Sequence, residues 1–177
     1  FAPRSSDPRG IEADNNGGDF NSPPRSGPEV NYGTLIGAPG TNAGIVNREG
    51  TWGVQSGLVV VDFDGPGYNM ADTAWSQPDG WGVGLVVQDS CFFGNQPNYP
   101  NDEDDPNDDN NALFDEPTEL SSGALGNLEE DPELGNTNGS ATGGTPDYSV
   151  SNTNCLGAFA PDGTDWKLMF EATYSRV

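Results

Sequence analysis

The chain has 177 residues, a formal net charge of −22 at pH 7 and no histidine. This length accommodates one domain with a hydrophobic core, but six basic residues are too few for the clusters that contact nucleic-acid phosphates. No apolar run approaches the roughly 20 residues that cross a bilayer, so neither nucleic acid nor a membrane span is expected.

Residues 1–30 are rich in proline, glycine, aspartate and asparagine and lack helical or strand periodicity, which predicts an extended or disordered N-terminal arm. Arg4, Arg9 and Arg25, half of the six basic residues, lie in this arm. Because the arm and the acidic body differ in charge, these arginines are candidate interface residues, for contacts with the body or with a neighbouring subunit. The alternative is a tail without fixed contacts.

Apolar runs at 32–36 and 43–46, separated by a Pro-Gly turn, predict two short strands. The segment 52–62 is echoed by 81–89, which is two residues shorter, and alternation predicts that the two copies are equivalent strands. A single repeat of two copies is too few for a solenoid or a propeller. The residues expected to line one face of the two copies are Trp52, Val54, Leu58 and Val60, and Trp81, Val83, Leu85 and Val87. In the first copy Val59, Val61 and Phe63 make the other face apolar as well, which indicates a strand covered on both sides.

Further strands are expected at 148–150, 155–159 and 166–175, the last with strict alternation of apolar and polar residues. Lys167 and Glu171 lie on its polar face and are candidate interface residues. No stretch of ten residues shows an uninterrupted helical period. The sequence therefore predicts an all-β fold, a single β-sandwich or jelly roll of about seven or eight strands over residues 31–177, with an acidic loop insertion at 94–146.

Cys91 and Cys155 are the only cysteines and flank this acidic insertion. A disulfide between them would close the base of the loop and is typical of an oxidising, extracellular compartment. Two buried free thiols and an intermolecular bridge are the alternatives.

Residues 105–116 contain the oxygen-ligand spacing of a calcium loop, with Asp105, Asn107 and Asp109 at positions 1, 3 and 5 and Glu116 at position 12. Position 6 is Asn110 instead of glycine, and neither flank has a helical pattern. Calcium is thus the one candidate cofactor, none is required, and a solvated acidic loop is the alternative.

The enzyme class most compatible with a β-sandwich is glycoside hydrolysis, with Glu171 as acid and Asp62, Asp89 or Glu49 as partner. No paired-carboxylate pattern occurs on the strands, and without histidine there is no serine–histidine or cysteine–histidine pair. A set of aromatic residues is a candidate platform for stacking of a glycan or, alternatively, a plug under the loops: Tyr68, Trp75, Phe92, Phe93 and Tyr99.

In composition alone, the chain resembles proteins of halophilic archaea and their viruses, because concentrated salt screens the self-repulsion of so acidic a surface. The expected function is that of a non-enzymatic structural subunit of an extracellular assembly, a virion shell first and a surface layer or filament next. Its partners would be other structural subunits. The alternatives are a secreted, calcium-dependent glycan-binding module and a small glycosidase.

Overall fold

The computed structural model describes residues 8–71, 81–100, 115–135 and 149–157, and its described part is built almost entirely of short strands. Nine strands and one helical turn follow in the order β1 (Ile11–Asp14), β2 (Glu29–Asn31), β3 (Thr34–Ile36), β4 (Ile45–Arg48), β5 (Gly53–Ser56), β6 (Val59–Val61), β7 (Tyr68–Met70), β8 (Leu85–Gln88), β9 (Cys91–Phe93) and α1 (Glu116–Leu120). The expected all-β class is confirmed.

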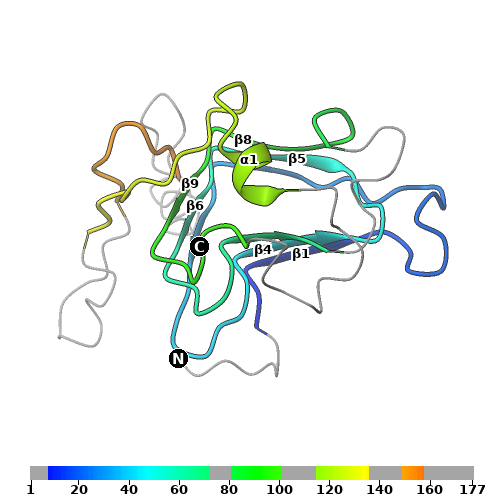
Figure 1. The fold of residues 1–177 in the computed structure, drawn as a ribbon, viewed down its shortest axis with the longest axis horizontal. Coiled ribbons are helices and arrows are strands. Elements are labelled where there is room, and N and C mark those ends of the chain that lie inside the picture. Colours follow the sequence, from blue (N-terminus) through cyan, green and yellow to red (C-terminus); the bar gives the residue numbers. More distant parts are fainter. Residues whose placement is uncertain (1–7, 72–80, 101–114, 136–148, 158–177) are drawn as a thin grey trace, which may run out of the picture.

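All strand pairs are parallel, and each strand pairs with the strand three places along the chain. The three sheets are β1-β4-β7, β2-β5-β8 and β3-β6-β9. The chain therefore winds through three successive coils, each contributing one strand to each sheet. Figure 1 looks along the stacking direction and shows the sheets on three sides of a central core. This is a three-sided parallel solenoid, whereas a sandwich or jelly roll of antiparallel strands was expected.

One corner of the solenoid has the same backbone conformation in every coil. Between β2 and β3, β5 and β6, and β8 and β9, a single residue turns the chain with positive φ: Tyr32 (56°), Gly57 (64°) and Asp89 (51°). Its N–H donates to the carbonyl of the next coil, at Ser56, Gln88 and Leu125 respectively, over 2.8 to 3.1 Å. A left-handed residue permits a sharp turn while the ladder of hydrogen bonds continues.

This corner corrects the expectation of one continuous strand over 52–62. Gly57 divides it into β5 and β6, so residues before and after the corner belong to different sheets. Leu58, Val60, Leu85 and Val87 are fully buried as expected, but Val54 is 36% exposed and Val83 is 77% exposed. The Gly57 corner resets the alternation between Val54 and Leu58, and Val83 lies in the turn that precedes β8.

The interior between the three sheets holds the main hydrophobic cluster, to which every sheet contributes. Its fully buried members include Ile45 and Tyr68 from the first sheet, Val87 from the second and Phe92 from the third. A polar group is buried among them: the amides of Asn47 and Gln55 exchange hydrogen bonds of 2.9 and 3.2 Å. Asn47 also donates to the Tyr68 hydroxyl at 3.1 Å, so the group is internally paired.

The segment after β9 closes one end of the solenoid. α1 lies across this end and places Leu120 in the main cluster (Figure 1). This segment accepts hydrogen bonds along the end: Met70 N–H of β7 donates to Glu116 Oε1 at 3.1 Å, Asp89 N–H at the corner after β8 donates to the Leu125 carbonyl at 2.8 Å, and Phe92 N–H of β9 donates to the Leu128 carbonyl at 2.9 Å. The edge that would otherwise extend to another coil is thereby satisfied.

The described part of the predicted N-terminal arm, residues 8–30, belongs to the body. It supplies β1 and most of β2, which form the first coil by pairing with β4 and β5. The prediction that this region lies outside the core was based on its many turn residues, which here connect strands of only three or four residues.

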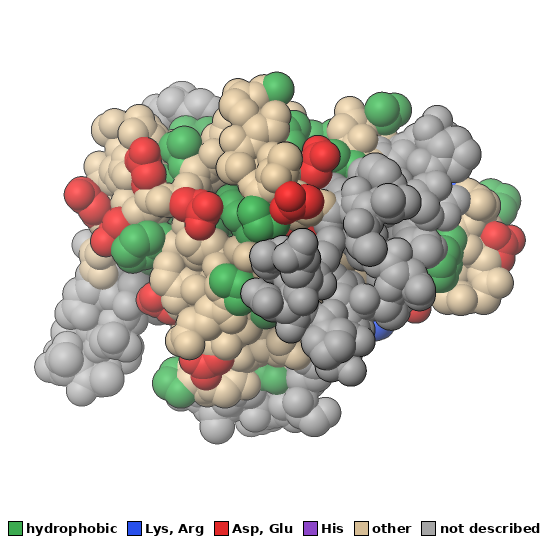
Figure 2. Space-filling model, in the orientation of Figure 1, with side chains coloured by type: hydrophobic (Ala, Val, Ile, Leu, Met, Phe, Trp, Pro, Cys, Tyr) green, Lys and Arg blue, Asp and Glu red, His purple; other side chains and the backbone are tan. Residues whose placement is uncertain are grey.

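Aspartate and glutamate side chains are scattered over the end of the molecule that α1 covers, as Figure 2 shows. No helix in the described ranges is long and apolar enough to cross a membrane.

Candidate functional site

A second hydrophobic cluster lies on the outer face of the sheet β3-β6-β9. Val59, Val61 and Cys91 point outward from this sheet, opposite to Val60 and Phe92, which face the interior. The outward residues are covered by residues 128–135 and 149–157, here called the cover segment. Its contributing side chains are Leu128, Leu134, Val150 and Cys155. The prediction that the strand around Val59 is covered on both faces is confirmed.

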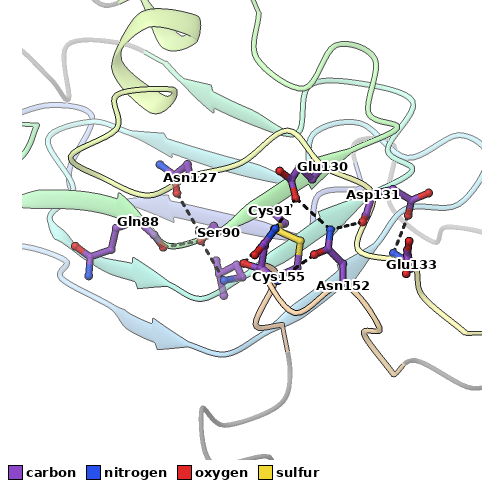
Figure 3. Close-up of a disulfide and its surroundings, with 11 residues drawn as sticks. Gln88, Ser90, Cys91, Asn127, Glu130, Asp131, Glu133, Asn152 and Cys155 are labelled. Atoms are coloured by element: carbon purple, nitrogen blue, oxygen red, sulfur yellow. Dashed lines mark hydrogen bonds between the residues drawn. A yellow bond between two sulfur atoms is a disulfide. The ribbon is translucent and has the colours of Figure 1, made fainter.

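The Cys91–Cys155 disulfide fastens the cover segment to this sheet, with 5.6 Å between the two Cα atoms. Cys91 is fully buried and Cys155 is 4% exposed. The predicted intramolecular bridge is confirmed, and it joins the first residue of β9 to the cover segment near its end, as Figure 3 shows.

Hydrogen bonds hold the exposed side of the cover segment (Figure 3). Asn152 donates to the Glu130 carboxylate at 3.2 Å and to the carbonyl of Asp131 at 2.9 Å. Asn154 donates to the same Glu130 carboxylate at 3.2 Å. Bonds from Asn154 and Asn152 stabilise the ionised form and lower the pKa of Glu130. The shift is opposite to the one that a general acid requires.

A pocket of about 260 Å³ opens beside the cover segment, where β6 and β9 end. It is lined by Val61 and Phe93 from the ends of the strands and by two further segments, here called its walls: Asp62 after β6, and Asp131 to Gly135 of the cover segment. Phe93 is 38% exposed. Carboxylates and one accessible aromatic ring therefore meet in one preformed depression, which sequence reasoning did not identify because Asp62 and Glu133 are far apart in the chain.

The aromatic platform expected from the sequence is mostly interior. Tyr68 and Phe92 are fully buried, and Tyr99, 6% exposed, packs edge-on against Phe92 with 5.1 Å between ring centroids. Burial raises the pKa of both tyrosines, first through loss of solvation. Of the five residues, Phe93 is the one described with an exposed ring, while Trp75 lies outside the described residues. The plug alternative thus holds for the three buried rings.

The predicted calcium ligands Asp105, Asn107 and Asp109 lie outside the described residues. Glu116 is described: it is fully buried in the first turn of α1, and its Oε1 accepts the hydrogen bond from Met70 N–H. Its observed role is to close the end of the solenoid. Within the described ranges, no group of three or more histidine, cysteine, aspartate or glutamate side chains is placed to hold a metal ion.

The candidate partners of Glu171 occupy separate corners. Asp89 precedes β9, whereas Asp62 follows β6, so these two carboxylates lie at opposite ends of the sheet β3-β6-β9. All three candidates, Glu49 included, have positive φ and occupy turns. Glu171 and Lys167 lie outside the described residues.

Two of the three arm arginines have described partners on the body or within the first coil. Arg9 forms an ion pair with Glu12 of β1, and Arg25 stacks over Trp52 with 4.3 Å between its guanidinium carbon and the ring centroid. Arg4 lies outside the described residues. An ion pair not anticipated from the sequence joins Arg48 of β4 to Asp14 of β1 at 2.8 Å. This hydrogen bond is the main reason that the pKa of Arg48 is raised.

No protein-family model, curated protein or solved structure matched this chain.

Proposed function

We propose that this chain is a non-enzymatic structural subunit of an extracellular assembly that works in concentrated salt. A virion shell is the favoured assembly, and a surface layer or a filament is the alternative. The net charge of −22 supports a high-salt setting, because an acidic surface repels itself unless salt screens it. The disulfide supports an oxidising compartment.

The observation that carries the proposal is the difference between the two ends of the solenoid. After the third coil, residues 115–128 supply acceptors to Met70 of β7, to Asp89 at the corner after β8 and to Phe92 of β9. At the other end, no strand within the described residues pairs with the outer side of β1, β2 or β3. Unpaired strand edges are suited to accept a strand from a neighbouring subunit. Because the two ends differ, we expect neighbouring subunits to make contact through the end formed by β1, β2 and β3.

The backbone of β2 identifies a residue that tests this edge. Val54 N–H donates to the Pro28 carbonyl and Tyr32 N–H to the Ser56 carbonyl. Alternate residues of a strand direct their backbone groups to opposite sides, so Asn31 directs its N–H away from β5. Replacing Asn31 by proline removes an outward donor while the pairing of β2 with β5 remains. Asn31→Thr keeps the N–H and is the matched control.

The test is sedimentation of the purified protein in about 3 M KCl, where charge repulsion is screened within about 3 Å. We expect multi-subunit particles for the parent and for Asn31→Thr, and a shift towards monomers for Asn31→Pro at unchanged thermal stability. A parent protein that stays monomeric at all concentrations, with or without candidate partner subunits, overturns the proposed function. Particles that form equally well from Asn31→Pro overturn the contact through this edge.

The enzyme alternative receives no support from the described carboxylates. Its expected acid, Glu171, lies outside the described residues, and two of its alternative partners, Asp62 and Asp89, lie at opposite ends of the sheet β3-β6-β9. The shift that lowers the pKa of Glu130 also opposes acid catalysis.

A further inference from the structure

We propose that the pocket beside the cover segment binds a neutral saccharide, about one sugar ring at a time. The site combines Phe93, which is 38% exposed, with carboxylates from the turn after β6 and from the cover segment. It is separate from the strand edges of the first coil and from the calcium loop expected at 105–116. The proposal therefore stands or falls independently of the proposed assembly.

The chemistry of the lining selects a ligand rich in hydrogen-bond donors. The carboxylates of Asp62, Asp131 and Glu133 accept hydrogen bonds and donate none, and the lining contains no lysine or arginine. The Asp131 carboxylate accepts a bond within the protein from the N–H of Glu133 at 2.8 Å. Hydroxyl groups that donate to carboxylates form the stronger, charge-assisted kind of hydrogen bond.

The acceptors come from two separate parts of the chain. Asp62 comes from the turn after β6, whereas Asp131 and Glu133 come from the cover segment. No described group of three acidic side chains is arranged to hold a metal ion. A ligand with several hydroxyl groups spaced around a ring matches such an arrangement, and a single metal ion does not.

The apolar part of the lining provides the complementary surface. Phe93 and Val61 lie side by side in register on β9 and β6, and Leu134 faces them from the cover segment. The exposed face of an aromatic ring packs against the C–H face of a sugar, while the sugar's rim of hydroxyls remains free for the carboxylates. A volume of about 260 Å³ lies below the usual range for larger ligands and suits one ring.

Both walls are fixed before any ligand arrives. Asp62 N–H donates to the Phe93 carbonyl at 3.2 Å, which ties the first wall to β9. On the other wall, Asn152 holds the Asp131 carbonyl and Gly135 N–H donates to Ser149. The disulfide at Cys91, two residues before Phe93, fastens the two walls to each other. A prearranged site loses little entropy on binding.

The test is saturation-transfer NMR and calorimetry on the full chain with four neutral sugars: glucose, galactose, mannose and N-acetylglucosamine. We expect at least one of them to bind. Asp62→Asn should weaken this binding about tenfold, because it removes a charged acceptor. Phe93→Leu should weaken it about three- to tenfold, because it keeps the apolar volume and loses the ring.

Matched controls lie outside the pocket. Asp89 is exposed and has positive φ, like Asp62, so Asp89→Asn should leave the affinity unchanged. Val83→Ala alters the most exposed large apolar side chain and should also have no effect. The affinity of a neutral sugar should persist from low salt to about 3 M KCl, whereas that of an organic cation would fall through screening.

Three results would overturn the proposal: no transfer to any of the four sugars at millimolar concentration, equal losses in Asp62→Asn and Asp89→Asn, or salt-sensitive binding of arginine methyl ester in place of a sugar.

Discussion

Removal of the Cys91–Cys155 disulfide tests how the cover segment contributes to stability. The bridge joins residues 64 positions apart. In the chain-entropy model a closed loop of this length restricts the unfolded chain by about 4 kcal/mol. We therefore expect the double variant Cys91→Ala/Cys155→Ala to lose about 4 kcal/mol of unfolding free energy. Domains usually have about 5–15 kcal/mol in total, so at the lower end of that range this loss removes most of the stability.

The assay is urea unfolding at fixed salt, followed by tryptophan fluorescence. Loss of the cross-link should also raise the m-value, because the unfolded chain expands and exposes more surface. Val59→Ala is the matched control: Val59 belongs to the same cluster, and its truncation costs about 1–3 kcal/mol with the bridge intact and the m-value unchanged. A loss below about 1 kcal/mol in the double variant, with no change in m, would refute this reasoning.

Four further predictions concern single residues of the body. Tyr99→Phe removes a buried hydroxyl that has no hydrogen-bond partner and should be neutral or stabilising, whereas Tyr68→Phe removes the acceptor of Asn47 and should cost about 1 kcal/mol, both by urea unfolding. Gly57→Ala should cost at least about 1–2 kcal/mol, since φ is 64° and the new methyl group would lie 2.7 Å from the Tyr32 ring; an unchanged urea midpoint would contradict the left-handed corner. Glu116→Ala should cost about 1–3 kcal/mol through the loss of the hydrogen bond that Glu116 accepts from Met70 N–H, and Glu116→Gln clearly less, by the same assay. Burial raises the pKa of Tyr68 and Tyr99 in the folded state, so above about pH 10 the unfolded chain ionises these tyrosines first and the folded state loses stability. Absorbance at 295 nm should show both tyrosines ionising only as the protein unfolds in alkali.

Local patterns in the sequence predicted several parts of the structure. The all-β class followed from short apolar runs, and the disulfide from two cysteines flanking an acidic insertion. Val59 and Val61 were expected to be buried opposite Val60, and both faces of β6 are indeed covered. These properties depend on residues within a few positions of each other or on the scarcity of one residue type.

The solenoid escaped prediction because its coils differ in length. Val54 pairs with Glu29, 25 positions earlier, and with Val86, 32 positions later. The echo between 52–62 and 81–89 would set Leu58 opposite Leu85, but Leu85 pairs with Gly53. Unequal turns shift the register between coils, so sequence similarity and spatial stacking do not coincide.

The recurring corner was hidden for a related reason. Its positions are occupied by Tyr32, Gly57 and Asp89, which share a backbone conformation and no side-chain property. Glycine and aspartate commonly adopt positive φ, but tyrosine rarely does. A search for turn residues directly after each short apolar run would have found two of the three.

The candidate pocket depends on tertiary contacts that sequence patterns do not specify. Phe93 belonged to the predicted aromatic set. Only the orientation of β9 shows that Phe93 is exposed whereas Phe92 and Tyr99 are buried. Asp62 was considered only as a candidate partner of Glu171, and Glu133 was not singled out. The cover segment brings them to one depression by packing on the outer face of the sheet β3-β6-β9.

Hydrogen exchange of backbone amides, compared between assembled material in concentrated salt and dispersed protein, tests the central claim most directly. Assembly through the open end predicts slower exchange in β1, β2 and β3 and no change in β7, β8 and β9, which residues 115–128 already seal. Equal exchange in both samples, or added protection confined to the sealed end, would contradict it.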